Sequence, residues 1–334
     1  MSKWIVRFPL KVLGWSFALV GFAVLVLTAM IATPLEGLPE LTSISQSARA
    51  VDRSSMPPLS RFSARDGTEL AYRHYPARGP SSGKIAILVH GSSGSSSSPH
   101  ALADALAARG VETYAPDIRG HGGSGTRGDV GFIGQLENDM ADLVAMVRKT
   151  SPTEPLTLLG HSAGGGFALR IASSPIQDLF ARTVLLAPYL GYDAPTNRPD
   201  SGGWASPDIP RYLALAALRR VGIECCDALP TLGFAVPPKS EWMLAPTYSY
   251  RLMRNFATRG YRDDLAGMTK PLTLIAGTDD ELMQADKYAD AVHAVAPSVD
   301  VKLIDGVDHM GIVSNIRAVS AIADDVATRR MAGT

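Results

Sequence analysis

The residues with the clearest chemical potential are 160–164, which read Gly-His-Ser-Ala-Gly. They follow the apolar run 156–159 and precede a glycine-rich stretch, with Phe167 and Leu169, that is typical of a helix. A G-x-S-x-G pattern between a strand and a helix forms a sharp turn that exposes a serine hydroxyl. Gly160 and Gly164 suit such a turn because it leaves little room for side chains. The pattern predicts Ser162 as a nucleophile; the simpler alternative is a glycine-rich turn whose serine only caps a helix.

A serine hydroxyl is a weak nucleophile and needs a base, which a carboxylate in turn orients. In an open parallel sheet, such groups come from loops at the carboxyl ends of the strands. The apolar run 272–276 is followed by Asp279 and Asp280, and the run 299–304 is followed by Asp308 and His309. These two loops are therefore the places where the sequence predicts an acid and a base.

Five motifs together resemble a known family: His-Gly at 90–91, the loop 117–125, the serine motif at 160–164, Gly-x-x-Asp at 277–280 and Val-Asp-His at 307–309. From about Arg61 to its end, the chain resembles the monoacylglycerol lipase and lysophospholipase-like (serine aminopeptidase-like) branch of the α/β-hydrolases. The order serine, acid, histidine is also that of the superfamily. The resemblance implies an α/β fold: a mostly parallel sheet with helices on both faces and a helical cap insertion. Two features depart from typical members: Ala163, where many have a larger residue, and the serine-rich stretch 92–98.

Carried over residue by residue, the resemblance implies that Ser162 is the nucleophile, Asp280 the acid and His309 the base. The backbone amides of Ser92 and Ala163 would form the oxyanion hole. Asp279 is the alternative acid, and a solvated loop histidine is the alternative interpretation of His309. Other histidines are weaker candidates for the base: His90, His121, His161 and His293. No His and carboxylate pair has metal-ligand spacing, so we expect no metal and no cofactor.

Composition excludes several functional classes. The 334 residues contain 32 basic and 32 acidic side chains, so no net field attracts nucleic acid. Hydrophobic residues make up 46% of the chain, enough for one large α/β domain with an insertion. The two cysteines, Cys225 and Cys226, are adjacent and indicate neither a disulfide scaffold nor a zinc site. The sequence does not indicate an oligomeric state.

The N-terminus resembles a membrane anchor. Lys3, Arg7 and Lys11 precede the uncharged stretch 12–34, about 20 apolar residues, which is the length that a membrane-spanning helix needs. We expect residues 1–34 to be an uncleaved signal anchor; a cleaved signal peptide and a buried core helix are the alternatives. The basic side precedes the span and Glu36 and Glu40 follow it, so the N-terminus would be cytoplasmic and the rest periplasmic or extracellular.

The remaining chain divides by composition. Residues 35–60 show little periodicity and predict a linker, and apolar runs alternate with helical patterns over 61–190 and again over 263–334. Residues 191–262 lack a clear buried strand and predict the cap. The cap contains many apolar side chains, some of which we expect to line an apolar channel over Ser162: Trp204, Tyr212, Leu213, Leu215, Leu218, Leu232, Phe234, Trp242, Met243 and Leu244.

These observations predict a membrane-anchored serine hydrolase that cleaves carboxylic esters such as a monoacylglycerol or a lysophospholipid. An aminopeptidase is the nearest alternative enzyme, and it would need acidic cap residues to hold a substrate amino group. The cap offers few of these: Asp200, Asp208, Glu224, Asp227 and Glu241. The third hypothesis is a non-catalytic hydrolase-like binding domain, which would be expected to lack part of the triad.

Overall fold

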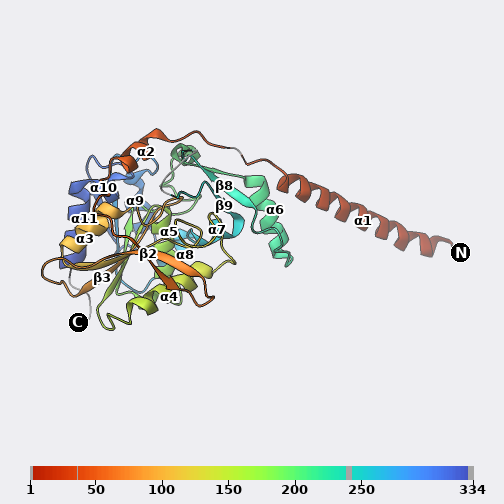
Figure 1. Ribbon diagram of the computed structural model, residues 1–334. Coiled ribbons are helices and arrows are strands. Elements are labelled where there is room, and N and C mark those ends of the chain that lie inside the picture. The colour runs from red at the N-terminus through yellow and green to blue at the C-terminus, as the bar shows by residue number, and fades with distance from the viewer. Residues whose placement is uncertain (1–2, 36, 238–242, 330–334) are drawn as a thin grey trace.

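One eight-stranded sheet organises the molecule. The computed structural model describes residues 3–35, 37–237 and 243–329 (Figure 1). Across the sheet the strands follow the order β1-β2-β4-β3-β5-β6-β10-β11. Their bounds in that order are Leu59–Ser63, Glu69–Tyr75, Val111–Pro116, Lys84–Val89, Leu156–His161, Arg182–Leu186, Leu272–Gly277 and Asp300–Ile304. The pairs β1–β2 and β2–β4 are antiparallel, and the pairs from β4 to β11 are parallel, as predicted.

Burial explains which segments became central strands. The side chains of β5 and β10 are all buried, and those of β3 are buried from Ile85 to Val89, as expected of strands covered on both faces. The edge strand β11 is only partly buried and carries Asp300 and Lys302, charges that discourage pairing with another chain. Loops that follow β3, β5, β10 and β11 therefore meet at one edge of the sheet.

Helices cover both faces of the sheet (Figure 1). One face carries α3 (His100–Ala108) and α11 (Ile316–Thr328), which pack side by side. The other carries α4 (Gln135–Val147), α5 (Ala163–Ala172) and α8 (Tyr261–Gly267). Two short helices, α9 (Tyr288–His293) and α10 (Gly311–Ser314), follow β10 and β11. The apolar periodicity of residues 311–329 predicts a single helix, but the structure has two, α10 and α11. The helices are separate because Asn315 is extended and its side chain caps α11.

The expected helical cap proves to be mixed. Residues 191–262 contain the helices α6 (Ile209–Arg220) and α7 (Tyr250–Asn255), but also a small antiparallel sheet. Its strands are β7 (Ala205–Pro207), β8 (Pro230–Phe234) and β9 (Thr247–Ser249). These strands were not predicted because they are only three to five residues long and two of them contain proline.

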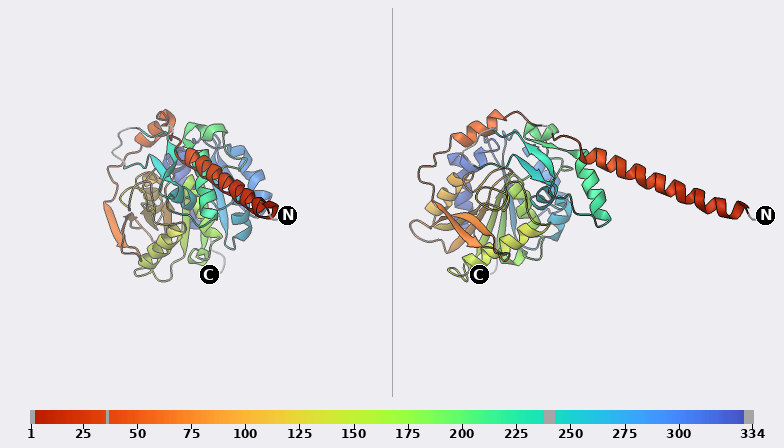
Figure 2. Two further views of the ribbon diagram at one scale, coloured as in Figure 1. Left: turned by 90° about the vertical axis from the view of Figure 1, so that its right-hand side faces the viewer. Right: turned by 45° about the vertical axis from the view of Figure 1, so that its right-hand side comes forward.

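The expected linker is also more structured than its composition predicts. It contains the helix α2 (Thr42–Arg49), whose Ile44 and Ser45 are buried against the domain. The chain reaches α2 from the N-terminal helix α1 (Lys3–Ile31), which extends away from the rest of the molecule (Figure 1 and the right-hand view of Figure 2). Arg211 of α6 donates hydrogen bonds to the carbonyl oxygens of Ile31 and Thr33, and so ties the end of α1 to the cap.

A membrane-spanning helix was expected at the N-terminus. Among the residues that the structure describes, no helix has both the length and the apolar character needed to cross a membrane. Glu36, one of the two acidic residues expected after the span, lies outside the described residues.

Candidate active site

The turn at residues 160–164 has the geometry of a nucleophile elbow. Ser162 has φ 55° and ψ −121° between the end of β5 and the start of α5. A Cβ at Gly160 would lie 2.1 Å from the carbonyl oxygen of Gly164, and one at Gly164 would lie 2.3 Å from that of His90. Only glycine fits at these two positions, as the sequence motif predicts. The Ser162 amide donates to Leu186 O (2.9 Å), which fixes the turn over β6.

Asp280 and His309 form a buried pair. His309 Nδ1 lies 2.8 Å from Asp280 Oδ2, and both side chains are at most 2% exposed. The second carboxylate oxygen, Oδ1, accepts the backbone amides of Leu282 (2.9 Å) and Met283 (2.7 Å), so the carboxylate is held at both ends. Asp279, the alternative acid, is exposed and its carboxylate accepts the Thr278 hydroxyl. The geometry thus brings Asp280, and not Asp279, to the histidine.

The two loops that carry this pair approach each other closely. A Cβ at Gly277 would lie 2.0 Å from Val307 O, so glycine is needed where β10 ends. The amide of Asp279 donates to Val307 O (3.0 Å), and the amide of His309 donates to the Glu281 carboxylate (2.9 Å). The loop after β10 therefore positions the loop after β11 through backbone contacts as well as through the Asp280 side chain.

Electrostatics favour charge separation in this pair. Burial opposes ionisation of both groups, but their mutual attraction and hydrogen bond outweigh it. The pKa of Asp280 is consequently lowered and the pKa of His309 is raised. An imidazole with a raised pKa and an Nδ1–H held by a carboxylate is suited to take a proton from a serine through Nε2.

The two predicted oxyanion residues come from different elements, and only Ser92 is among the residues that line the pocket. Ala163 is the first residue of α5, and Ser92 belongs to the loop after β3. The Ser92 hydroxyl accepts a hydrogen bond from Trp204 Nε1 of the cap (2.8 Å). The next residue, Ser93, has φ 63°, and its amide donates to the buried hydroxyl of Tyr248 (2.7 Å). Two aromatic cap residues thus hold the oxyanion loop in a conformation that is strained for serine.

Tyr248 belongs to a second histidine cluster that sequence reasoning missed. Its hydroxyl also contacts Nε2 of His121, and the ring of His121 packs on His90. His90 Nε2 accepts the amide of Ile118 (3.2 Å), so this imidazole acts as an acceptor within the loop after β4. Burial lowers the pKa of both histidines. Both histidines therefore support the loops around the site and do not act as the base. The sequence gives no sign of the role of Tyr248, since nothing in residues 245–250 indicates a partner in the loop after β3.

The remaining candidate histidines do not reach Asp280. His161 donates through Nε2 to the backbone oxygen of His309 (3.0 Å), and burial lowers its pKa to about 3. His293 lies at the end of α9 and contacts Val299 O. Within the described ranges, no group of three or more His, Cys, Asp or Glu side chains is placed to hold a metal ion. Cys225 and Cys226 are free thiols.

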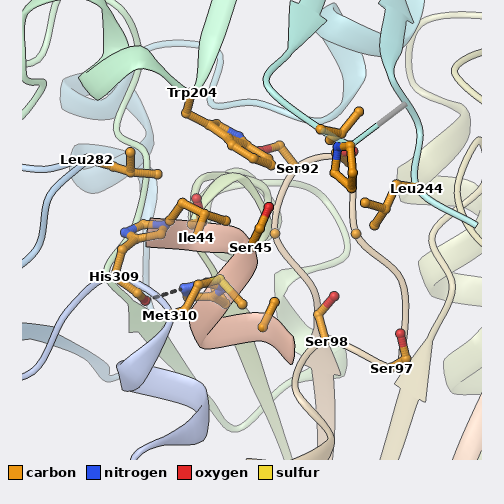
Figure 3. A pocket seen from close by; sticks show the side chains of 18 of the residues that line it. Ile44, Ser45, Ser92, Ser97, Ser98, Trp204, Leu244, Leu282, His309 and Met310 are labelled. Atoms are coloured by element: carbon orange, nitrogen blue, oxygen red, sulfur yellow. Dashed lines mark hydrogen bonds between the residues drawn. The ribbon is translucent and has the colours of Figure 1, made fainter. Parts of the chain in front are cut away.

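Ser162 and His309 line one pocket of about 70 Å³ (Figure 3). Of the cap residues expected there, Trp204 and Leu244 line it; Leu213 is exposed, Leu215 and Phe234 are buried elsewhere, and Trp242 lies outside the described residues. The pocket also has walls that sequence reasoning missed. They come from α2 and the segment after it, and from the loops after β10 and β11: Ile44, Ser45, Ala48, Arg53, Leu282 and Met310.

Known proteins share this fold and part of this sequence. A soluble variant of monoglyceride lipase from Saccharomyces cerevisiae, solved with a substrate analogue, superposes with a TM-score of 0.63 at 18% identity, over 82% of this chain and 95% of that one. The sequence family described as serine aminopeptidase, S33, matches residues 80–219. The chain has the α/β-hydrolase fold.

Two sequence relatives of this α/β-hydrolase agree with the predicted branch. A monoacylglycerol lipase of Mycolicibacterium smegmatis is 36% identical over 83 residues, which is 25% of this chain and 30% of the relative. A monoglyceride lipase homolog of monkeypox virus is 23% identical over 242 residues, 67% of this chain and 81% of the relative. The resemblance to the monoacylglycerol lipase-like branch is confirmed.

Proposed function

We propose that this α/β-hydrolase is a membrane-anchored serine esterase that cleaves monoacyl lipids, such as a monoacylglycerol or a lysophospholipid. The observation that carries the proposal is the buried pair of Asp280 and His309, 2.8 Å apart, in a pocket that Ser162 also lines. A nucleophile, a base and an orienting acid are the three groups that acyl transfer needs.

In the proposed reaction, Ser162 Oγ attacks the acyl carbonyl while His309 Nε2 takes the hydroxyl proton. The oxygen of the tetrahedral intermediate carries the negative charge and accepts hydrogen bonds from the backbone amides of Ser92 and Ala163. In known enzymes, a single such donor lowers the activation barrier by roughly 3 kcal/mol. The intermediate collapses, and His309 passes the proton to the leaving alcohol. Water, activated by the same histidine, then hydrolyses the acyl-enzyme.

The substrate class is proposed from the pocket lining and from the relatives. Around Ser162 the pocket is mostly apolar, with Trp204, Val236, Leu244 and Leu282 among its residues. An apolar wall favours an acyl chain because each buried methylene contributes about 0.8 kcal/mol. The relatives named as monoacylglycerol and monoglyceride lipases support the same class.

Labelling by a fluorophosphonate tests the catalytic claim most directly, since it requires an activated serine. The full-length chain is expected to react, and Ser162→Ala is expected to remain folded, to escape labelling and to retain less than about one thousandth of the ester hydrolysis. Labelling of the Ser162→Ala variant at full rate would assign the nucleophile to another residue. A wild-type chain that does not react would favour the non-catalytic binding domain.

A series of esters with two to twelve acyl carbons tests the substrate claim. We expect kcat/KM to rise from two to about eight carbons and aminoacyl amides to be slower. A flat or falling series would favour a small-ester esterase, and faster cleavage of aminoacyl amides would favour a peptidase.

The membrane anchor is part of the proposal. Residues 12–34 carry no charge, and the described apolar side chains of α1 are open to the surroundings, with Trp15 72% and Phe17 70% exposed. Exposed apolar surface of this kind is typical of an interaction site, and lipid is the partner that we propose for it. The basic residues before it support a cytoplasmic N-terminus with the hydrolase on the periplasmic or extracellular side. Reporters fused after residue 60 test this: activity of a reporter that works only in the cytoplasm would contradict it.

The aminopeptidase alternative rests on the description of the matching family. It requires an acidic cap residue near the scissile bond, but none of the acidic cap residues that the structure describes lines the pocket. Asp208, Glu224 and Asp227 pair instead with arginines of α6. Glu241 lies outside the described residues. The esterase is therefore the better-supported function.

A further inference from the structure

The helix α2 belongs to the segment before the hydrolase domain, yet it forms part of the catalytic pocket. Ile44, Ser45 and Ala48 all line this pocket together with Ser162 and His309. Figure 3 shows Ile44 and Ser45 in the middle of the pocket, between Trp204 on the cap side and Met310 on the base side. Ile44 is 7% exposed and Ser45 is 5% exposed, so this contact is not a loose surface packing.

The amphipathic pattern of α2 explains which side chains enter the pocket. Leu41, Ile44 and Ala48 are spaced three and four residues apart and therefore share one face of the helix. That face packs on the hydrophobic core, whereas Ser43 and Gln46 are exposed. A tether that merely connected two parts of the chain would need no such face.

Three hydrogen bonds fasten the segment to three different walls of the pocket. The amide of Leu41 donates to Ala235 O of the cap (3.1 Å). The hydroxyl of Ser47 donates to Asp308, the neighbour of His309 (3.1 Å). Arg53 Nε donates to Ser97 O in the serine-rich loop (3.3 Å), and its Nη2 donates to Ala48 O at the end of α2 (2.8 Å). The position of α2 is thus defined relative to the base, the cap and the oxyanion loop.

We propose that α2 and Met310 form an acyl subsite in which the side chain at position 44 limits the length of the acyl chain. The proposal deepens the proposed ester hydrolysis and rests on it. Ile44 lines this pocket together with the apolar side chains of Leu282 and Met310, and an apolar wall of this kind suits an unbranched acyl chain. A cavity of about 70 Å³ holds about five water molecules, so side-chain volume at this wall restricts what can enter.

The test is the acyl-length profile of full-length variants in one detergent solution. Ile44→Ala is expected to increase the ratio of kcat/KM for a twelve-carbon ester to that for a four-carbon ester about tenfold relative to wild type. Ile44→Phe is expected to decrease the same ratio about tenfold. Comparing ratios at one detergent concentration cancels the partition of long esters into micelles. Gln46→Ala, on the exposed face of the same helix, is the matched control and should leave the profile unchanged.

The outcomes separate this proposal from the proposed function. If Ile44→Ala and Ile44→Phe hydrolyse esters with the wild-type profile, or lose all chain lengths equally, α2 sets no chain length and the proposal is wrong. Ile44→Val, which removes a single methylene, serves if Ile44→Ala fails to fold, and it should shift the ratio in the same direction by less. If wild type cleaves no ester, labelling by two-carbon and twelve-carbon alkyl fluorophosphonates gives the same ratio. Absence of labelling would refute the esterase itself and the subsite with it.

Discussion

Two pairs of neighbouring histidines lie beside the elbow, His161 with His309 and His90 with His121, each with tilted rings whose centroids are 4.8 Å apart. All four rings are buried. His309 alone among them contacts a carboxylate, that of Asp280, and its pKa is raised. The other three bond to backbone groups or to Tyr248, and burial lowers their pKa values. Burial by itself keeps an imidazole neutral; a partner carboxylate is what turns one buried histidine into a base that can carry a proton.

The largest expected effect comes from removing that carboxylate. Asp280→Asn leaves the size of the side chain unchanged but removes its charge and its ability to hold the Nδ1–H tautomer, so we expect kcat to fall by about 10³ to 10⁴. Asp279→Asn is the matched control, since Asp279 is the preceding residue and is exposed. The kcat of this variant should stay within about twofold of wild type. Equal losses in the two variants would mean that a general charge effect, not the contact with His309, distinguishes the two histidine pairs.

The pKa of His309 is raised whereas those of the other three histidines are lowered, so activity and stability should depend on pH in different ways. Below the raised pKa of His309 the base is protonated, so kcat/KM should fall about tenfold per pH unit from a midpoint above the ordinary value of about 6.5. A midpoint well below 6.5 would contradict the assignment of His309 as the base. The rate profile of wild type with an eight-carbon ester measures this.

The pH dependence of the free energy of unfolding is expected to reflect the other three histidines. His90, His121 and His161 have lowered pKa values, so their contribution is complete above about pH 6.5 and is lost as the pH falls. His309 contributes in the reverse sense: its stabilisation is present below about pH 6.5 and is lost as the pH rises through its raised pKa. Denaturant unfolding between pH 7.5 and 5 should show a net loss of stability on acidification, because three groups oppose one.

Tyr248→Phe tests the second pair through a smaller effect. The substitution leaves the Ser93 amide without its acceptor and His121 Nε2 without its donor. A buried group left unsatisfied costs about 1–3 kcal/mol of stability, and we expect kcat to fall about tenfold because the oxyanion loop relaxes. Tyr250→Phe is the control in the same part of the cap. A loss of stability with unchanged kcat would limit Tyr248 to a structural role.

The smallest expected effect is that of Trp204→Phe. This change removes the donor to Ser92 Oγ but keeps an aromatic ring beside Phe234. We expect a two- to fivefold decrease in kcat, comparable to one net hydrogen bond of about 0.5–1 kcal/mol. Ser92→Ala removes the same bond from the other side, so the double variant should lose no more than either single variant. Additive losses would show that the two residues act independently.

The sequence predicted the catalytic groups better than the walls around them. Ser162 and Asp280 follow the buried strands β5 and β10, and His309 follows the edge strand β11. The carboxyl ends of these parallel strands lie at one edge of the sheet, so the sheet alone brings their loops together. Ile44 and Tyr248 lie beside residues that are distant in the sequence: Ile44 lines the pocket with Met310, and Tyr248 bonds to Ser93, which is 155 positions away. Ile44 belongs to a short helix with two apolar residues and Tyr248 to a three-residue strand; such local patterns indicate an element but not what it packs against.

The hydrogen bond between Ser47 and Asp308 joins residues 261 positions apart. A contact of that span forms only once the strands between its partners have folded, because closing a loop through an unfolded chain costs entropy that grows with its length. The segment with α2 is synthesised before all of these strands and is consequently expected to dock after them. Only two of the eight residues of α2 are buried, whereas all of β5 is buried, so the amides of α2 should exchange with solvent well before those of β5.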